Sequence, residues 1–383
     1  MPTARIGDNV HPILGQLLQQ RGWEIASGKC QDWQLNWQHS RFPILQYADC
    51  RGEQLLNRFR NAHGITRKDC LARHLRRMKS TYGNIYSFSP CTYIMPRERH
   101  QLVLQLTDPR IWIVKPCASS QGRDIYVCCS ADLKSQDLSR VSCIVQEYIP
   151  HPMLVSGYKF DLRLYVLVRS FQPLRLYLYR RGLTRFSSER YSLDISSLGN
   201  VYSHLTNSSI NKHSPSLGQD KDGIGIGCKW TAARLYLHLA QSGFDVDRLK
   251  RRIRHLIILT FASICQEVDP NPHCFELFGV DILIDNRAKP WLIEVNSSPA
   301  LAVSCEEDQQ VKIPMLNDLF DSIGFTHPVL TGQRSNEFDQ IFPIPNLSTA
   351  NGSKNKANMS SKSCVDAVRK DIKKTRNMNK LGE

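Results

Sequence analysis

The run 158-YKFDLRLYVLV-168 constrains the fold more than any other part of the sequence. Apolar and polar side chains alternate along it with the two-residue period of a β-strand. Lys159, Asp161, Arg163 and Tyr165 share one face, and the residues between them form an apolar face that predicts burial in a core. Two cations and a carboxylate in a row suit a polyanion and its metal. They also suit a solvated ladder of ions on an exposed sheet face. This strand alone favours the solvated ladder.

Neighbouring parts of the chain predict a mixed architecture. Runs rich in β-branched and aromatic residues predict strands, and amphipathic patterns predict helices. The expected strands are 111–116, 125–129, 142–149, 174–180, 275–285 and 290–296, and the expected helices are 66–79, 97–107, 230–240 and 247–268. Thr66 is the expected N-cap of the first helix. Strands and helices that alternate within one continuous core indicate an α+β fold.

Two of the expected strands carry polar side chains in apolar surroundings. Asp281 interrupts GVDILI, and Glu294 and Asn296 share one face of PWLIEVN. A carboxylate inside such a strand is costly to desolvate unless it is paired or bound to a metal. Two carboxylates and an amide oxygen are hard ligands that suit Mg²⁺. The alternative is a buried Asp and Glu paired with arginine; together with the Lys-Asp-Arg strand, the pattern favours the metal.

Lys115 ends the strand IWIVKP and precedes the small, polar stretch 117-CASSQGR-123. A flexible loop between two strands can close over phosphates through its backbone N–H groups and serine hydroxyls. It is not a Walker A loop, because it lacks G-K-[ST] and a strand follows it. Taken alone, the stretch favours an ordinary hairpin turn.

Composition narrows the class of partner. The chain of 383 residues has 50 Lys and Arg against 35 Asp and Glu, a net charge of +15 that predicts an acidic partner. Its 13 cysteines show no disulfide spacing, its N-terminus lacks the apolar core of a signal peptide, and no apolar run is long enough for a membrane span. We therefore expect a cytoplasmic or nuclear protein with reduced thiols and no membrane association. Residues 350–383 hold nine Lys or Arg and three Asp or Glu, which predicts a disordered basic tail.

Read together, these segments resemble the tubulin-tyrosine-ligase-like family, and most closely its polyglutamylase branch. The matching segments are TRKDCLARHL (66–75), IWIVKPCASSQGRDI (111–125), IVQEYI (144–149), YKFDLRLYVLV (158–168), YRRGLTRFSSERY (179–191), HLTNSSINK (204–212), GCKWT (227–231) and CFELFGVDILID…KPWLIEVNSSPAL (274–301). Each is weak alone, but all follow the family order. The resemblance implies an ATP-grasp core with nucleotide between two domains. Expected are an N-terminal domain (1–65), a central domain (66–148), a C-terminal domain (149–325) with the Mg-ATP and acceptor sites, and a linker with the basic disordered tail (326–383).

The resemblance also implies roles for individual residues. Those expected to bind ATP are Lys68, Lys115, Gln121, Gly122, Gln146, Glu147, Tyr148, Ile149, Lys159, Asp161, Thr206 and Asn207. Asp281, Glu294 and Asn296 are expected to bind Mg²⁺, which agrees with the strand faces. Arg163, Arg185 and Glu294 are the expected catalytic residues, and Arg185, Ser209, Lys229 and Lys312 the expected substrate-binding residues.

One position departs from the family pattern. The family loop S-x-G-x-G-I is here Ser120-Gln-Gly-Arg-Asp124-Ile125, with Asp in place of the second glycine. If that glycine adopts a positive φ, Asp tolerates the conformation poorly, although better than a branched residue does. The carboxylate also adds negative charge near the phosphates. Reduced nucleotide affinity or turnover is the expected consequence.

The implied activity is ATP-dependent ligation of glutamate to glutamate side chains of acidic tubulin tails, through an acyl phosphate. ATP and Mg²⁺ are the expected cofactors. Microtubules and free L-glutamate are the expected partners, without nucleic acid. We expect a monomer on the microtubule cytoskeleton, with a cilium or basal body as a further location. Two alternatives stay open: a non-catalytic or weakly active microtubule-binding relative, and a ligase for glycine or tyrosine.

Overall fold

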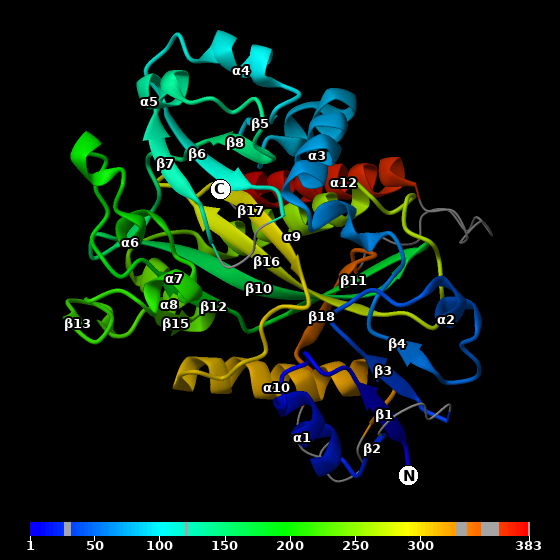
Figure 1. Cartoon of the computed structure of the whole chain (residues 1–383). Helices are drawn as coiled ribbons and strands as arrows, with labels where there is room; N and C mark the ends of the chain where they lie inside the picture. The colour runs from blue at the N-terminus through cyan, green and yellow to red at the C-terminus, as the bar shows by residue number, and fades with distance from the viewer. Residues whose placement is uncertain (27–31, 119–121, 327–334, 346–359, 382–383) are drawn as a thin grey trace.

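The computed structural model describes residues 1–26, 32–118, 122–326, 335–345 and 360–381, and Figure 1 shows the whole chain. Strands and helices alternate throughout, which confirms an α+β fold. Among the described residues, no helix combines the length and the apolar character needed to cross a bilayer. Every cysteine in the described ranges is a free thiol.

The N-terminal part contains a small parallel sheet in the order β2-β1-β3-β4. Its strands are β1 (Thr3–Ile6), β2 (Glu24–Ala26), β3 (Leu35–Trp37) and β4 (Leu55–Leu56), and its helices are α1 (Ile13–Gln20) and α2 (Ile44–Ala48). Parallel neighbours need a crossover, and α1 provides it between β1 and β2. The sequence did not predict this sheet, because its strands are too short to show a period.

A second sheet, antiparallel, has the order β5-β8-β6-β7. It comprises β5 (Thr92–Ile94), β6 (Ile111–Pro116), β7 (Tyr126–Cys129) and β8 (Cys143–Glu147), with α3 (Lys68–Tyr82), α4 (Arg99–Gln105) and α5 (Ser130–Ser135) around it. The predicted cap of α3 is wrong. Arg67 is the N-cap residue, and the Thr66 hydroxyl instead donates to the His63 carbonyl oxygen. Figure 1 shows this sheet facing the large sheet described next.

The large sheet is organised around the long strand β10 (Tyr158–Phe171). Strand β16 pairs along one stretch of it, and β12 and β11 pair with its two halves. The remaining strands and bounds are β9 (Leu154–Val155), β11 (Leu174–Tyr179), β12 (Leu183–Phe186), β15 (Lys229–Thr231), β16 (Glu276–Ile284), β17 (Pro290–Ser297) and β18 (Phe338–Phe342). Between them come α6 (Val201–His204), α7 (Ser208–Asn211), β13 (Asp220–Lys221) and β14 (Gly225–Ile226). Every ladder within the large sheet is antiparallel.

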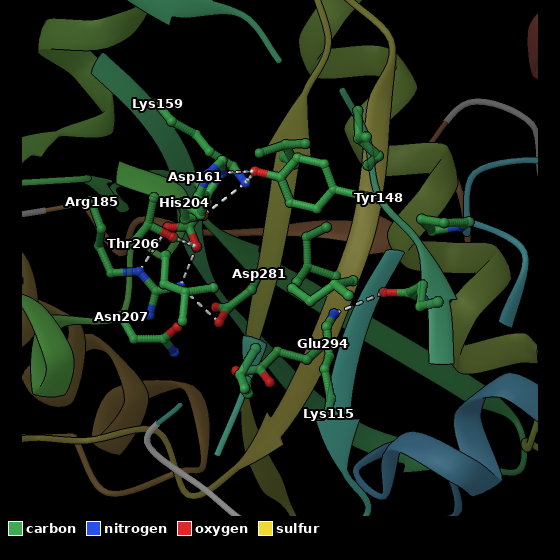
Figure 2. A pocket seen from close by; sticks show the side chains of 18 of the residues that line it. Lys115, Tyr148, Lys159, Asp161, Arg185, His204, Thr206, Asn207, Asp281 and Glu294 are labelled. Atoms are coloured by element: carbon green, nitrogen blue, oxygen red, sulfur yellow. Dashed lines mark hydrogen bonds and ion pairs between the residues drawn. The ribbon is translucent and has the colours of Figure 1, made fainter. Parts of the chain in front are cut away.

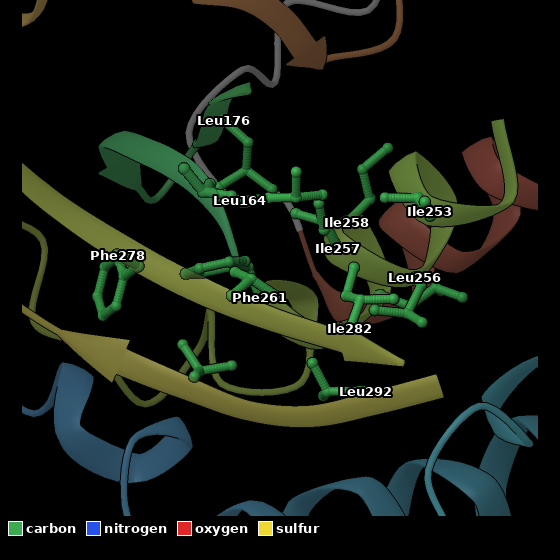
Figure 3. Packing of buried hydrophobic residues seen from close by; sticks show 14 of the residues in the cluster. Leu164, Leu176, Ile253, Leu256, Ile257, Ile258, Phe261, Phe278, Ile282 and Leu292 are labelled. Atoms are coloured by element: carbon green, nitrogen blue, oxygen red, sulfur yellow. The ribbon is translucent and has the colours of Figure 1, made fainter. Parts of the chain in front are cut away.

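Helices cover both faces of the large sheet. On one face, α9 (Val246–Ala262) buries Ile253, Leu256, Ile257 and Phe261 against the apolar face of β10, as Figure 3 shows. Helix α8 (Ala232–Gln241) joins the same core. On the other face, α10 (Glu306–Ser322) covers Tyr165 and Leu167. The polar face of β10 therefore begins with charged residues and continues at Tyr165 into a second core. The charged residues lie at the edge of that core.

Within the expected linker and disordered tail (326–383), residues 338–342 and 361–381 form regular elements, and the prediction of disorder is wrong for the second of these segments. The first segment is strand β18, which pairs with β11. The second is helix α12 (Ser361–Leu381), which packs on α9 and buries Cys364, Val365 and Val368. These apolar side chains recur at helical spacing and can therefore fold onto a core, which the high Lys and Arg content conceals. Residues 346–359 lie outside the described ranges.

Candidate active site

A pocket lies between the antiparallel central sheet and the large sheet, and we call it chamber A (Figure 2). It holds about 690 Å³ of space, part of which is open to solvent. Its lining residues are Pro90, Ile113, Lys115, Ile125, Gln146, Glu147, Tyr148, Ile149, Lys159, Asp161, Arg185, His204, Leu205, Thr206, Asn207, Asp281, Leu283, Ile293 and Glu294. Apolar side chains from both sheets alternate with charged ones, a combination typical of a nucleotide-sized ligand site.

Two buried lysines enter chamber A from opposite sheets. Lys115 Nζ donates to Gln146 Oε1 at 2.8 Å, and Gln146 Nε2 donates in turn to Thr92 Oγ1 at 2.8 Å. This relay fixes Lys115 at the end of β6. Burial lowers the pKa of Lys115 to about 8, although the charge of Glu294 opposes that shift.

Lys159 enters from the large sheet and is held by hydrogen bonds to α6 and to the segment that follows β8. Its Nζ donates to the Tyr148 hydroxyl at 2.7 Å and to the His204 carbonyl oxygen at 2.8 Å. The ammonium also lies 4.4 Å from the centre of the Tyr148 ring. Burial lowers its pKa to about 7, and the charge of Lys115 lowers it further. Burial disfavours the charged form of both lysines, so an anionic ligand would stabilise that form.

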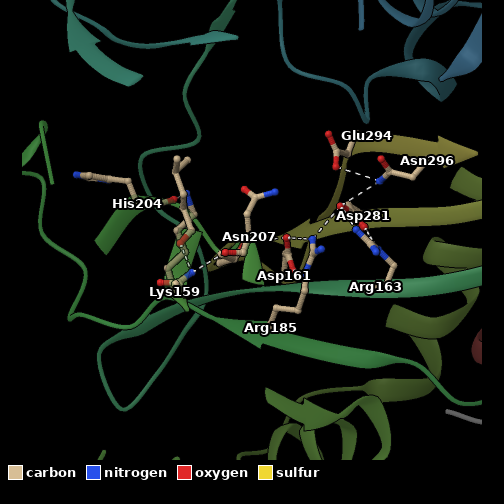
Figure 4. Close-up of polar contacts among 12 residues, drawn as sticks. Lys159, Asp161, Arg163, Arg185, His204, Asn207, Asp281, Glu294 and Asn296 are labelled. Carbon is tan, nitrogen blue, oxygen red and sulfur yellow. Dashed lines mark hydrogen bonds and ion pairs between the residues drawn. The ribbon is translucent and has the colours of Figure 1, made fainter. Parts of the chain in front are cut away.

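Carboxylates and guanidiniums form a continuous chain along the floor of chamber A (Figure 4). Arg185 Nε and Nη2 donate to the two oxygens of Asp161 at 2.7 and 2.6 Å. Arg185 Nη2 also donates to Asp281 Oδ2 at 2.8 Å, and Arg163 clamps the same carboxylate at 2.5 and 3.0 Å. The Thr206 hydroxyl donates to Asp161 at 2.7 Å. The structure thus places Asp161 and Arg163 in a buried network, and the solvated ladder of ions that this strand alone favours is wrong.

The predicted metal ligands meet at one point of the β16–β17 hairpin. Asp281 is the register partner of Glu294, and Gly279 that of Asn296, so all three side chains lie on one face. Asn296 Nδ2 donates to Glu294 Oε1 at 3.0 Å. Burial raises the pKa of Glu294, and the charge of Asp281 raises it further. Burial would also raise the pKa of Asp281, but the charges of Arg163 and Arg185 hold it well below its usual range.

These observations test whether a divalent cation fits. Asp281 is paired with arginine, which is the alternative that the sequence left open for it. Glu294 instead makes its hydrogen bonds to Asn296 and to Asp281. A carboxylate that burial and a like charge drive toward protonation is relieved by a cation. Asn296 presents its Nδ2 to the two carboxylates in this structure. Rotation of the amide by half a turn would present Oδ1 instead. The donor set fits Mg²⁺.

The departure at Asp124 has a backbone counterpart. Asp124 adopts a φ of 57° and Gly122 a φ of 76°, so both positions lie in the left-handed region. A Cβ at residue 122 would also collide with the side chain of Ile210. The condition stated for this position, a positive φ, is therefore met at Asp124. Gln121, an expected nucleotide ligand, lies outside the described residues.

A larger cavity, chamber B, adjoins chamber A and holds about 1,860 Å³ of space, part of it open to solvent. Arg185, Asn207 and Glu294 line both chambers. All the residues expected to bind the acceptor or the incoming amino acid line chamber B, namely Arg163, Arg185, Ser209, Lys229 and Lys312. The N-terminal segment 8–12 and His39 complete its wall. Two ligands can therefore meet at the boundary that the shared residues form.

The structure brings most predicted site residues into these two chambers. Lys68, at the first turn of α3, and Gly122 are not among the lining residues, but the charge of Lys68 opposes the raised pKa of Glu294. Sequence reasoning missed His204, Thr92, Tyr165 and Asp308. Asp308 had a visible signal, since it precedes Lys312 by one helical turn. Tyr165 also had one, because it shares the polar face of its strand with Asp161 and Arg163. Thr92 and His204 had none, because only the tertiary fold brings them to the site.

Two facing sheets that enclose a lysine from each side, with an acidic hairpin on the floor, define an ATP-grasp-like fold. A model of the tubulin-tyrosine ligase family matches residues 48–335, and the chain belongs to that family.

The chain is also similar to individual curated proteins. It is 39% identical over 345 residues to the mouse (Mus musculus) protein named "Probable tubulin polyglutamylase TTLL2", covering 87% of this chain and 62% of that protein. The human (Homo sapiens) protein of the same name is 40% identical over 331 residues, covering 83% of this chain and 55% of the relative. Human tubulin monoglutamylase TTLL4 is 38% identical over 329 residues, covering 82% and 27%. The chain thus spans little more than half the length of the first two relatives.

Proposed function

We propose that this protein is an ATP-dependent ligase that adds glutamate to glutamate side chains of tubulin tails. The observation that carries the proposal is the position of Glu294. Its carboxylate lies beside Asp281 and lines both chambers, and its charge raises the pKa of Lys115 in chamber A. A nucleotide in chamber A and an acceptor in chamber B would meet there. The names of the similar proteins support glutamate and tubulin as the substrates.

In this proposal, chamber A holds ATP. Residues 146–149 connect the two sheets and line the end of the chamber where an adenine ring would lie. Lys115 and Lys159 neutralise the phosphates, and Asp161 and Thr206 hold the polar side of the nucleotide. Burial lowers the pKa of both lysines, and the negative charge of the phosphates would stabilise their protonated forms. Positioning and charge neutralisation are the main requirements of phosphoryl transfer.

Asp281, Glu294 and Asn296 would hold Mg²⁺. When bound, the ion neutralises charge that develops on the transferring phosphoryl group. The arginine contacts of Asp281 keep that carboxylate ionised, so it is ready to accept a cation at any physiological pH.

The acceptor side of the reaction belongs to chamber B. A carboxylate is a poor electrophile, and the γ-phosphoryl group converts it to an acyl phosphate as ADP leaves. The amine of free glutamate then attacks the acyl carbon, the amide bond forms, phosphate departs, and the nitrogen loses a proton. The Nη1 groups of Arg163 and Arg185 make no hydrogen bond within the described residues, so they remain available to carboxylates.

The charge of the molecule suits this acceptor. Tubulin tails are acidic, and a net charge of +15 attracts them through a long-range field. We accordingly propose a location on the microtubule cytoskeleton. The rival proposal is a microtubule-binding relative without activity, and the left-handed Asp124 is the observation in its favour.

The decisive experiment offers the purified chain microtubules, Mg-ATP and one labelled amino acid at a time. Intact-mass spectrometry of the tubulin is the measurement. Addition of glutamate residues that requires ATP supports the proposal and rejects the rival. Incorporation of glycine or tyrosine alone would overturn the choice of substrate, and no incorporation of any amino acid would overturn the assignment as an active ligase.

A further inference from the structure

Two cysteines meet where helix α12 packs against the end of α9. Cys265 follows shortly after the last residue of α9, and Cys364 lies in the first turn of α12. Both side chains are completely buried in the core that α9 shares with the large sheet. Their thiol groups are hydrogen-bonded to each other. Two segments that are far apart in the sequence thus bring two sulfur atoms into contact.

The surroundings of the Cys265 sulfur favour its thiolate form. The hydrogen bond from the Cys364 thiol is the main cause that lowers the pKa of Cys265, and burial opposes it. The Ser361 hydroxyl, 3.6 Å from the Cys265 sulfur, and the backbone N–H groups of Cys265 and Gln266 lower the pKa further. The thiolate is the nucleophilic form of cysteine, so Cys265 is the more reactive member of the pair.

Cys364 is the complementary member of the pair. Its hydrogen bond to Cys265 raises its pKa, and burial raises it further, so Cys364 keeps a proton when Cys265 has lost one. The first turn of α12 is also fixed at the end of α9, because Ser361 Oγ donates to the Ala262 carbonyl oxygen at 2.7 Å. When a thiolate has a second thiol beside it, its oxidation leads to a disulfide.

Only noncovalent contacts hold the described part of α12 against its neighbours. His255 Nε2 lies 2.7 Å from Asp371 Oδ2, and Arg369 Nη2 donates to the Tyr82 carbonyl oxygen at 2.9 Å. Val365 and Val368 are completely buried in the same core as the two cysteines. Such contacts open locally without unfolding of the whole protein, and a small reagent can then reach the sulfur atoms.

We infer that Cys265 and Cys364 form a modification site, at which a peroxide converts the two thiols to a disulfide that joins α9 to α12. The inference goes beyond the proposed ligase function and does not depend on it. Neither cysteine is among the described residues that line chamber A or chamber B. In the oxidised protein, α12 and its exposed lysines would stay attached to α9 by a covalent bond.

The reaction balances with hydrogen peroxide as the oxidant. The Cys265 thiolate attacks one peroxide oxygen, an S–O bond forms, the O–O bond breaks, and hydroxide leaves. That hydroxide takes the proton of Cys364 and becomes water. The Cys364 thiolate then attacks the Cys265 sulfur, the S–S bond forms, and the S–O bond breaks. The second hydroxide recovers the proton that Cys265 released, so two thiols are oxidised and one peroxide is reduced to two waters.

Mass spectrometry of the full chain tests the inference directly. The reduced protein is treated with hydrogen peroxide, its remaining thiols are alkylated, and it is digested without a reductant. We expect one linked pair of peptides that contains Cys265 and Cys364, with a mass lower by two hydrogen atoms than the sum of the two thiol peptides. Recovery of both cysteines as alkylated thiols would overturn the inference, and so would a sulfinic acid at Cys265 beside an unmodified Cys364.

Cys117 and Cys143 are a matched control within the same chain. Both are buried in neighbouring strands of the central sheet, where Pro116 is the register partner of Cys143. Burial raises the pKa of both thiols, so neither is a ready nucleophile. We expect the disulfide between Cys265 and Cys364 to form at least about tenfold faster than any product at this pair. Equal rates would overturn the inference, because peroxide would then oxidise buried thiols without selection.

Substitution with serine assigns the two roles. Cys364→Ser keeps a donor beside Cys265 but cannot form the disulfide, so peroxide should leave a sulfenic acid at Cys265 that dimedone traps. Cys265→Ser should leave Cys364 as a thiol at the same peroxide concentration. Trapping of Cys364 in Cys265→Ser, with no trapping of Cys265 in Cys364→Ser, would overturn the assignment of Cys265 as the attacking group.

Chemical denaturation measures the effect of the bond on the fold and needs only the wild type. The oxidised protein should unfold at a higher denaturant concentration than the reduced protein, because a disulfide between distant segments restricts the unfolded chain. Dithiothreitol should reverse the shift, and Cys364→Ser should show none. A midpoint that falls on oxidation would overturn the inference, because the packed helices would then not accommodate the bond.

Discussion

Glu294 is the side chain on which the proposed metal site depends most directly. Glu294→Gln keeps the shape and removes one of the two negative charges that would hold the ion. We expect ligation to fall at least a hundredfold, measured at saturating ATP over a range of Mg²⁺ concentrations. The melting temperature should not fall, since the variant also removes a buried carboxylate that lies beside Asp281. Wild-type activity in the variant would contradict the metal assignment.

Asp124 and Gly122 form a natural pair for testing the loop, because both have a positive φ. Asp124→Gly relieves the backbone and removes the carboxylate next to Ile125, which lines chamber A, so we expect equal or higher activity and a lower KM for ATP. Gly122→Ala strains the backbone and collides with Ile210, so we expect a KM for ATP at least tenfold higher. A loss of activity in Asp124→Gly at unchanged melting temperature would show that Asp124 has an adapted role.

Lys159 predicts a dependence on pH. Burial lowers its pKa from 10.5 to about 7, so between these values the folded chain binds fewer protons than the unfolded chain. This group therefore makes the ligand-free protein more stable as pH rises from about 7 to 10. Phosphates favour the ammonium form, so ATP binding should take up protons and weaken as pH rises through this window. Calorimetry at pH 8 in buffers of different ionisation enthalpy measures that uptake, and Lys159→Met should reduce it.

At the scale of single elements, α12 is the largest difference between expectation and structure. Val368 is completely buried on α12, whereas Lys370 is exposed on the same helix. We expect Val368→Ala to lower the free energy of unfolding by about 1–3 kcal/mol, and Lys370→Ala to change it by less than about 0.5 kcal/mol. Chemical denaturation measures both. Equal, negligible effects would show that α12 does not pack on α9 in solution.

The elements differ in how far the sequence could predict them. β10 and α9 were predictable, because a long and regular alternation of apolar and polar residues is compatible with only one type of secondary structure. The hairpin that carries Asp281 and Glu294 was predictable as a site because adjacent strands bring their polar faces together. The sheet β1–β4 was not, because strands of two to four residues show no period. Tyr165 and Asp308 were not recognised as neighbours in chamber B, because α10 and β10 meet only in the folded chain.

At the scale of the whole molecule, surface charge should decide binding to microtubules separately from chemistry. Lys370, Lys373 and Lys374 are exposed on α12, far along the chain from both chambers. Their simultaneous replacement by Glu should weaken microtubule binding and reduce its dependence on salt, since exposed charges act through a field screened within ~8 Å. Activity on a short acidic peptide should stay within about twofold. Co-sedimentation and peptide ligation measure the two effects.

The control for this prediction reverses three other exposed cations, Arg97, Lys134 and Arg140, around the central sheet. It changes the net charge by the same amount. Equal losses of microtubule binding in both triple variants would show that only total charge matters. A loss confined to the α12 variant would locate the surface that meets the microtubule.

The wall shared by chambers A and B has a thermodynamic consequence. Arg185, Asn207 and Glu294 line both cavities, so whatever occupies one cavity fixes side chains that the other ligand needs. The binding free energies of the two ligands are then coupled, and linkage makes the coupling reciprocal. If nucleotide tightens acceptor binding tenfold, acceptor must tighten nucleotide binding tenfold. ATP would then bind more weakly in the absence of an acceptor. Weaker binding would limit the hydrolysis of ATP by water between encounters with a substrate.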